Sequence, residues 1–123
     1  MKALLIIAHG SRRKSANDEI ENVANQVSQT QSNGYDIVIH AFLEFAEPDI
    51  ANGINQCVES GATEVTVVPY FLAAGSHVVR DIPTELSSCR KNHPELTINL
   101  SQHFGVINSI AKSIVECAQM KTG

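Results

Sequence analysis

The chain has 123 residues, of which 43% are hydrophobic and 18% charged, and its formal net charge is −4. This length and composition fit one globular domain over residues 1–123 and exclude a disordered chain. The acidic balance argues against a nucleic-acid partner, which would need a basic face. The opening apolar run Ala3–Ala8 is too short for a signal peptide or a membrane span. We therefore expect a cytoplasmic protein with no membrane partner.

Apolar runs alternate with amphipathic stretches along the chain. The apolar runs predict strands at residues 3–8, 35–43, 64–70 and 96–100, and the amphipathic stretches predict helices at residues 15–31, 48–60, 81–93 and 106–120. Ser15 is expected to cap the first helix, and Pro48 to begin the second. Pro69 should lie at the carboxyl end of its strand, because proline cannot donate to a central ladder. The segment 71–80 is expected to be a loop.

Strands that alternate with helices pair in parallel through right-handed crossovers. The order predicts an α/β fold, in which a four-stranded parallel doubly wound sheet of flavodoxin-like order 2-1-3-4 has helices on both faces. Such sheets bind ligands at the carboxyl ends of their strands, near the point where the strand order reverses. The residues that follow the four strands are therefore the candidate site residues.

Three residues that follow neighbouring strands can carry chemistry. His9 ends the first strand, Glu44 ends the second, and His77 lies in the loop after the third. Since neighbouring strands are only about 4.8 Å apart, these side chains are expected to converge. Two imidazoles and a carboxylate can hold a divalent first-row metal, and they can also accept protons near neutral pH.

Other functions are possible at the same loops. The glycine turn before the first helix could bind a phosphate, but the chain has neither a dinucleotide fingerprint nor a P-loop. Ser11 and Ser76 lie near histidines, yet no G-x-S-x-G motif supports a hydrolase. The basic run Arg12, Arg13 and Lys14 is either a solvated loop or a site for substrate carboxylates, and the sequence leaves both open.

The remaining histidines differ in their position. His40 lies inside the second strand and His93 at a helix end, so both are expected to be structural. His103 follows the fourth strand on the ligand edge, and Glu47 lies close behind Glu44. Whether either of these two joins the site is left open.

Three stretches of the sequence resemble a known family. The first is LLIIAHGSR near the N-terminus. The second is FLEFAEPDI, at the end of the second predicted strand, and the third is VVPYFLAAGSHVVRDIP, at the end of the third. In order and length they are similar to the CbiX-type sirohydrochlorin chelatases, in the short single-repeat form of the class II chelatases. The fourth loop departs from the family pattern, because Gln102 and His103 stand where that pattern has proline.

The resemblance implies a chelatase-like fold and the ATP-independent insertion of Co²⁺, Fe²⁺ or Ni²⁺ into sirohydrochlorin or a related anionic tetrapyrrole, as in cobalamin or sirohaem biosynthesis. The metal would be a substrate, and no organic cofactor is implied. The resemblance gives the metal-binding and catalytic roles to His9, His77 and Glu44. The residues expected to bind the substrate are Ser11, Arg12, Gly75 and Ser76.

A single repeat further implies a homodimer, because longer relatives carry two such repeats in one chain. The competing hypothesis is a non-catalytic carrier of metal or tetrapyrrole that uses the same fold and the same residues. Turnover would separate the two functions, since a carrier only binds stoichiometrically.

Overall fold

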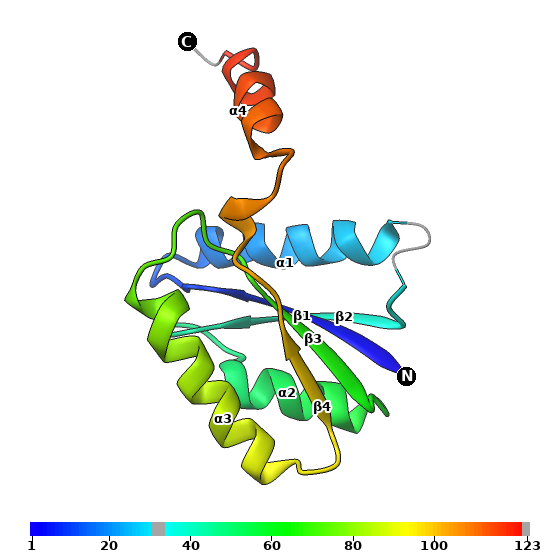
Figure 1. Cartoon of the computed structure of the whole chain (residues 1–123). Helices are drawn as coiled ribbons and strands as arrows, with labels where there is room; N and C mark the ends of the chain where they lie inside the picture. The colour runs from blue at the N-terminus through cyan, green and yellow to red at the C-terminus, as the bar shows by residue number, and fades with distance from the viewer. Residues whose placement is uncertain (31–33, 122–123) are drawn as a thin grey trace.

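The computed structural model describes residues 1–30 and 34–121. Its strands are β1 (Lys2–Ala8), β2 (Ile37–Phe42), β3 (Glu64–Pro69) and β4 (Thr97–Leu100). Its α-helices are α1 (Lys14–Gln29), α2 (Ile50–Glu59), α3 (Ile82–Asn92) and α4 (Ile110–Ala118). Two short helical turns complete the fold, the π-helical η1 (His77–Asp81) and the 3₁₀-helical η2 (Phe104–Val106). Figure 1 shows this arrangement.

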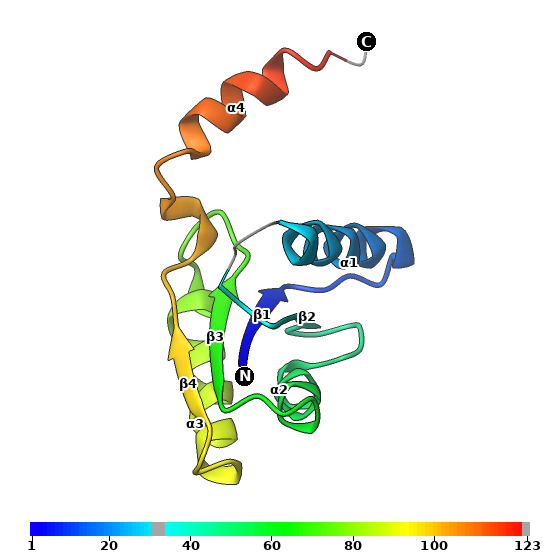
Figure 2. The same cartoon turned by 90° about the vertical axis from the view of Figure 1, so that its right-hand side faces the viewer.

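The four strands form one parallel sheet in the order β2-β1-β3-β4, so the predicted fold class and strand order are confirmed. α1 lies on one face of the sheet, and α2 and α3 lie on the other (Figures 1 and 2). Pro69 is the last residue of β3 and lies beside Ile7 of β1, as expected for a residue without an N–H group. All four carboxyl ends therefore meet at one edge, which we call the carboxyl edge.

The core explains why β1 is so apolar. Every residue from Ala3 to Ala8 is buried, because β1 is a central strand with helices on both of its faces. The larger cluster lies on the face of α2 and α3 and the smaller one under α1. In β3, by contrast, buried Val65 and Val67 alternate with half-buried Thr66 and Val68. The face of β3 on the α1 side is thus less completely covered.

Several helix starts differ from the sequence-based expectations. Ser15 does not cap α1, which begins one residue earlier without a side-chain cap. Pro48 does not begin α2, because Asp49 is its N-cap and accepts a 2.9 Å hydrogen bond from the Asn52 backbone N–H. A carboxylate satisfies a free N–H group there, which proline could not do. α1 ends at Gln29, and residue 31 of the predicted helix lies outside the described residues.

The segments after β3 and β4 also differ from expectation. The predicted loop over residues 71–80 ends at His77, where η1 begins and continues directly into α3. The predicted helix over residues 106–120 is shorter in the structure, because Val106 ends η2 and α4 begins only at Ile110. α4 points away from the sheet in both views (Figures 1 and 2). In the described part of the chain, no helix has the length and hydropathy needed to cross a membrane.

Candidate metal-binding site

Three strand ends bring His9, Glu44 and His77 together at the carboxyl edge. His9 follows β1, Glu44 follows β2, and His77 begins η1 after β3. One ligand atom from each of the three lies within 4.8 Å of the others. The His9 Nε2 atom lies 3.1 Å from Glu44 Oε1, and the two imidazole rings are 4.9 Å apart. The convergence expected from the sequence is therefore present in the structure, and we call this group the metal cluster.

A glycine allows the first two members to approach each other. Gly10 has φ +93°, in the left-handed region that favours glycine. A Cβ atom at Gly10 would lie 1.8 Å from the Glu44 carbonyl oxygen, so no other residue fits without moving that backbone. The Glu44 backbone N–H also donates to the His9 carbonyl oxygen at 3.0 Å. The H-G dipeptide thus positions Glu44 as well as His9.

The hydrogen bonds of His9 define what can occupy the space beside it. Its Nδ1 lies 3.0 Å from the Gly10 carbonyl oxygen, which can only accept, so Nδ1 carries a hydrogen. Its Nε2 faces the Glu44 carboxylate, which is also an acceptor when ionised. Two facing acceptors repel unless a positive charge lies between them. The His9–Glu44 pair therefore accommodates one proton or one metal ion.

His77 is held by Asp81, a residue that the sequence pattern does not assign to the site. Its Nδ1 lies 2.8 Å from Asp81 Oδ2, and the two residues are one helical turn apart on η1. The ionised carboxylate accepts from Nδ1–H and leaves Nε2 as the nitrogen that can bind a metal. The hydrogen bond from His77, with help from Arg80, lowers the pKa of Asp81 below its ordinary value. Recognising that the H-V-V-R-D segment is helical would have revealed this pair.

An aromatic side chain joins the metal cluster to the basic run. Phe45 is 51% exposed and has φ +69°, which is unusual for a residue other than glycine. Its ring lies 6.0 Å from the His9 ring, and the Arg12 guanidinium lies 4.8 Å from its centre. Lys14, by contrast, pairs with Asp18 of the same helix at 3.1 Å. Only part of the basic run is thus close to the site.

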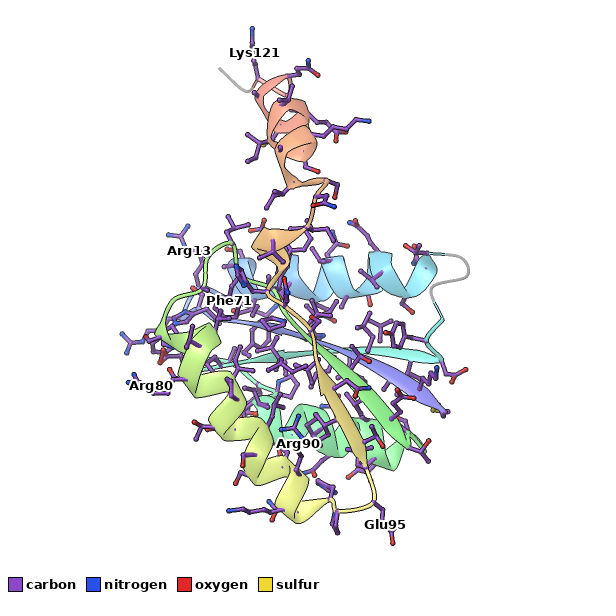
Figure 3. All side chains as sticks on the ribbon, in the orientation of Figure 1. Arg13, Phe71, Arg80, Arg90, Glu95 and Lys121 are labelled. Atoms are coloured by element: carbon purple, nitrogen blue, oxygen red, sulfur yellow. The ribbon has the colours of Figure 1, made fainter. Side chains whose placement is uncertain are left out.

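A groove extends from the metal cluster along α3. Its volume is about 460 Å³. The residues that line it are Leu43, Glu44, His77, Arg80, Asp81, Thr84 and Glu85. Arg80 projects into solvent at the same side of the molecule as Arg13 (Figure 3). The side chains of the metal cluster are 42–43% exposed, so the cluster is open to a ligand and also to water.

The expected substrate-binding residues lie close to the metal cluster in the chain but have local partners. The Ser11 hydroxyl accepts a hydrogen bond from the Arg13 N–H at 3.0 Å. The Gly75 carbonyl oxygen accepts from two N–H groups at the start of η1, and the exposed Ser76 precedes that turn. These contacts position the two loops, and Arg12 is the member that contacts the aromatic residue of the site.

Glu47 and His103, whose membership of the site the sequence does not decide, lie outside the metal cluster. Glu47 accepts hydrogen bonds from Asp49 and Asn52 and so stabilises the start of α2. His103 does not belong to the group of candidate metal ligands among residues 1–30 and 34–121. The histidines expected to be structural are His40, which packs against Phe42, and His93, which bonds to Asn55.

Comparisons with known proteins agree with this architecture. The CbiX family model matches residues 3–120. The sirohydrochlorin ferrochelatase of Priestia megaterium is 33% identical over 118 residues, which are 94% of this chain and 43% of that protein. The sirohydrochlorin cobaltochelatase of Sulfurisphaera tokodaii is 31% identical over 116 residues, which are 94% of this chain and 90% of that protein.

The chain also matches solved structures closely. The structure of the sirohydrochlorin chelatase SirB from Bacillus subtilis subspecies spizizenii in complex with cobalt superposes with a TM-score of 0.88 at 29% identity. The match covers 97% of this chain and 50% of SirB. The chain thus spans half of SirB and less than half of the Priestia relative.

Proposed function

The chain belongs to the CbiX family, and on that premise we propose that it inserts Co²⁺, Fe²⁺ or Ni²⁺ into sirohydrochlorin or a related anionic tetrapyrrole without ATP. The observation that carries the proposal is the metal cluster, in which two imidazoles and one carboxylate lie within 4.8 Å at the carboxyl edge. Such a donor set suits borderline divalent metals, because it contains no thiolate. The Priestia and Sulfurisphaera relatives are an iron and a cobalt chelatase, respectively.

We propose that the Nε2 atoms of His9 and His77 and a Glu44 oxygen hold the incoming metal. The hydrogen bonds of the two Nδ1 atoms support this role, because they leave Nε2 as the ligating nitrogen on both rings. A binding site with three protein ligands leaves coordination positions open, so the metal can be passed to another ligand. The half-exposed position of the side chains is suited to transfer, since a macrocycle can reach the metal from the solvent side.

Insertion of a divalent metal releases two protons from the pyrrole N–H groups of the macrocycle. The His9–Glu44 pair accepts one positive charge at a time, so departure of the metal makes room for a proton. In our proposal this pair is the general base for one pyrrole N–H, and His77 is the base for the other. Arg12 is proposed to attract the substrate carboxylates, with Ser11, Gly75 and Ser76 lining the approach.

We propose that the chain acts as a homodimer in the cytoplasm. Two observations support the dimer: the chain matches only half of SirB, and its groove is open to solvent. A second copy could supply the other wall of a cleft for a flat macrocycle. The cytoplasmic location agrees with the free thiols of Cys57, Cys89 and Cys117 among the described residues.

An anaerobic insertion assay tests the proposed activity. Sirohydrochlorin and one metal at a time are mixed with catalytic amounts of the protein, and the change in macrocycle absorbance gives the rate. We expect many turnovers with at least one of the three metals. Binding that stops at one equivalent, with no rate above the uncatalysed reaction, would support the carrier function instead.

The matched variants for this assay are Glu44→Gln and Glu47→Gln. Glu44→Gln keeps the shape of a metal-cluster side chain but removes its charge, so insertion should slow strongly. Glu47→Gln changes a carboxylate of the same loop that stabilises α2, so insertion should continue. Equal rates for the two variants would exclude Glu44 from the mechanism.

A further inference from the structure

Phe45 is an exposed aromatic residue in a backbone conformation that phenylalanine rarely adopts. It is 51% exposed, whereas Phe42, three residues earlier, is 2% exposed and belongs to the core. The φ of Phe45 is +69°. Glycine or asparagine adopts this left-handed conformation at lower energy and would leave no apolar ring in water. The turn alone therefore does not account for a phenylalanine at this position.

The backbone is fixed on both sides of Phe45, so its conformation is maintained. The Phe42 N–H donates to the Pro48 carbonyl oxygen at 2.8 Å and closes a loop that has Phe45 at its middle. Within this loop the Glu44 N–H donates to the His9 carbonyl oxygen at 3.0 Å. Strained backbone conformations persist only where the surrounding structure imposes them, and they are concentrated at functional sites. The loop thus holds the Phe45 ring beside the metal cluster.

The ring of Phe45 has a candidate metal ligand and a cation as neighbours. Its centre lies 6.0 Å from that of the His9 ring, in an edge-to-face arrangement, and 4.8 Å from the Arg12 guanidinium. The face of an aromatic ring carries negative charge, so it attracts the guanidinium and restricts where that group can lie. In order of contact, the metal cluster is therefore followed by an aromatic ring and then by a cation.

An anionic tetrapyrrole has the same order of chemical groups from its centre outward. Its central nitrogens receive the metal, a flat conjugated ring system surrounds them, and carboxylate side chains lie at the periphery. A conjugated ring packs favourably against an aromatic side chain. A carboxylate forms charge-assisted hydrogen bonds with a guanidinium. The three neighbours on the protein thus match the three parts of such a substrate.

We propose that the tetrapyrrole lies against the ring of Phe45, which places its central nitrogens near His9 and holds Arg12 where the substrate carboxylates reach it. This inference rests on the proposed function and adds the residue that positions the macrocycle. Phe45 has no group that binds a metal or accepts a proton, so it acts through substrate binding and orientation. Loss of its ring should therefore weaken the binding of the macrocycle without weakening the binding of the metal.

Substitutions at position 45 separate these two binding events. Metal-free sirohydrochlorin is titrated by its absorbance, and Co²⁺ is titrated in the absence of the macrocycle. Phe45→Leu keeps a large apolar side chain without a flat ring, so it should bind sirohydrochlorin about 2- to 10-fold more weakly, as expected when one aromatic pair is lost. Its affinity for Co²⁺ should equal that of the wild type. Phe45→Tyr keeps the ring and is the matched control, which should bind both ligands as the wild type does.

Phe45→Gly distinguishes a role in binding from a role in folding. Glycine adopts the left-handed conformation without strain, so the melting temperature should not decrease. The affinity for sirohydrochlorin should fall at least as far as in Phe45→Leu. A lower melting temperature together with an unchanged affinity would overturn the proposal, because Phe45 would then serve the fold.

A double variant tests whether the ring acts on Arg12. Arg12→Ala and Phe45→Leu are compared with the protein that carries both changes. Because the ring holds the guanidinium in place, the double variant should lose less sirohydrochlorin affinity than the product of the two single losses. A loss equal to that product would show that Arg12 is held without Phe45 and would overturn this part of the proposal.

Two further results would overturn the proposed position of the macrocycle. One is wild-type affinity for sirohydrochlorin in both Phe45→Leu and Phe45→Gly. The other is a loss of Co²⁺ affinity in Phe45→Leu as large as its loss of sirohydrochlorin affinity, because the ring would then support the metal cluster. Neither result bears on the chelatase function, which is tested separately by the turnover of the wild-type chain.

Discussion

The two histidines of the metal cluster have carboxylate partners on opposite sides of their rings. Glu44 faces Nε2 of His9, the nitrogen that would ligate a metal, at 3.1 Å. Asp81 accepts a 2.8 Å hydrogen bond from Nδ1 of His77, the nitrogen that would not ligate a metal. The same combination of an imidazole and a carboxylate therefore has a different effect at each histidine. Glu44 can share a metal or a proton with His9, whereas Asp81 orients His77.

The two histidines also differ in what fixes their position. His9 is held through the backbone, by the close contact of Gly10 with the Glu44 carbonyl group. His77 is held through its side chain, by a partner one helical turn away on η1. We expect the first loop to be sensitive to backbone shape and the second to charge. Substitutions in each loop test this difference.

Removing either imidazole should have the largest effect. His9→Ala and His77→Ala should each lower the insertion rate by about 10²–10⁴-fold, as expected when a general base is lost. Both side chains are half-exposed, so melting temperatures should change little. His93→Ala is the control, because it removes a histidine at the far end of α3 that bonds to Asn55 and lies outside the metal cluster. Its insertion rate should stay close to that of the wild type. Wild-type rates in both cluster variants would contradict the proposed mechanism.

Gly10→Ala should damage the first loop through the backbone. The positive φ costs about 1–3 kcal/mol of unfolding free energy, and the new methyl group must displace the Glu44 carbonyl group. The affinity for Co²⁺, measured by titration, should decrease together with the stability of the protein. Gly61→Ala is the matched control, because Gly61 has φ +96° and nothing near its missing Cβ. Equal metal affinity in the two variants would show that the Gly10 contact does not position Glu44.

Asp81→Asn should affect the second loop through charge. It should weaken Co²⁺ binding about 10- to 100-fold, because the partner that fixes the ring orientation is changed. Asp18→Asn removes a more exposed carboxylate that pairs with Lys14 and should leave binding unchanged. An affinity equal to that of the wild type would show that His77 is oriented without Asp81.

The pH dependence of this effect follows from the pKa of Asp81. Its pKa is lowered from 3.8, chiefly by the hydrogen bond from His77. The ionised Asp81 carboxylate therefore holds His77 fully at any pH above the ordinary pKa of 3.8. This interaction is lost only as the pH falls through the lower pKa that Asp81 has in the folded protein. Ionisation of Asp81 itself should therefore add no pH dependence to the difference in Co²⁺ affinity between Asp81→Asn and wild type from pH 6 to pH 8. A difference that changes in this range would assign the titration to another group.

Arg12→Ala should have the smallest effect. An exposed charge contributes about 0.2–1 kcal/mol, so the apparent affinity for sirohydrochlorin should fall only about 1.4- to fivefold. The salt dependence of that affinity should also decrease, because an exposed charge that attracts an anion is screened by salt. Arg13→Ala is the comparison, since the guanidinium that lies over the Phe45 ring is that of Arg12. If Arg12→Ala and Arg13→Ala bind sirohydrochlorin with equal affinity at low salt, Arg12 is merely solvated.

The architecture could be predicted from the sequence because it depends on local patterns. The continuous apolar run of β1 indicates a strand buried on both faces, and alternation with helices leads to parallel pairing. Once the order is known, the carboxyl ends of β1, β2 and β3 must meet at one edge. The convergence of His9, Glu44 and His77 follows from that geometry. Pro69 could be placed at a strand end for an equally local reason.

What only the tertiary structure decided depends on the local conformation of the loops and on contacts between distant segments. Asp81 became a partner of His77 because η1 is helical, and residues 71–80 carry no clear helical period. Gly10 matters because the backbone of Glu44, a residue far from it in the sequence, approaches it. α4 is amphipathic in the sequence, but a hydrophobic stripe does not say which surface covers it. The sequence determines which residues are apolar, and the spatial course of the chain determines which of them its own sheet covers.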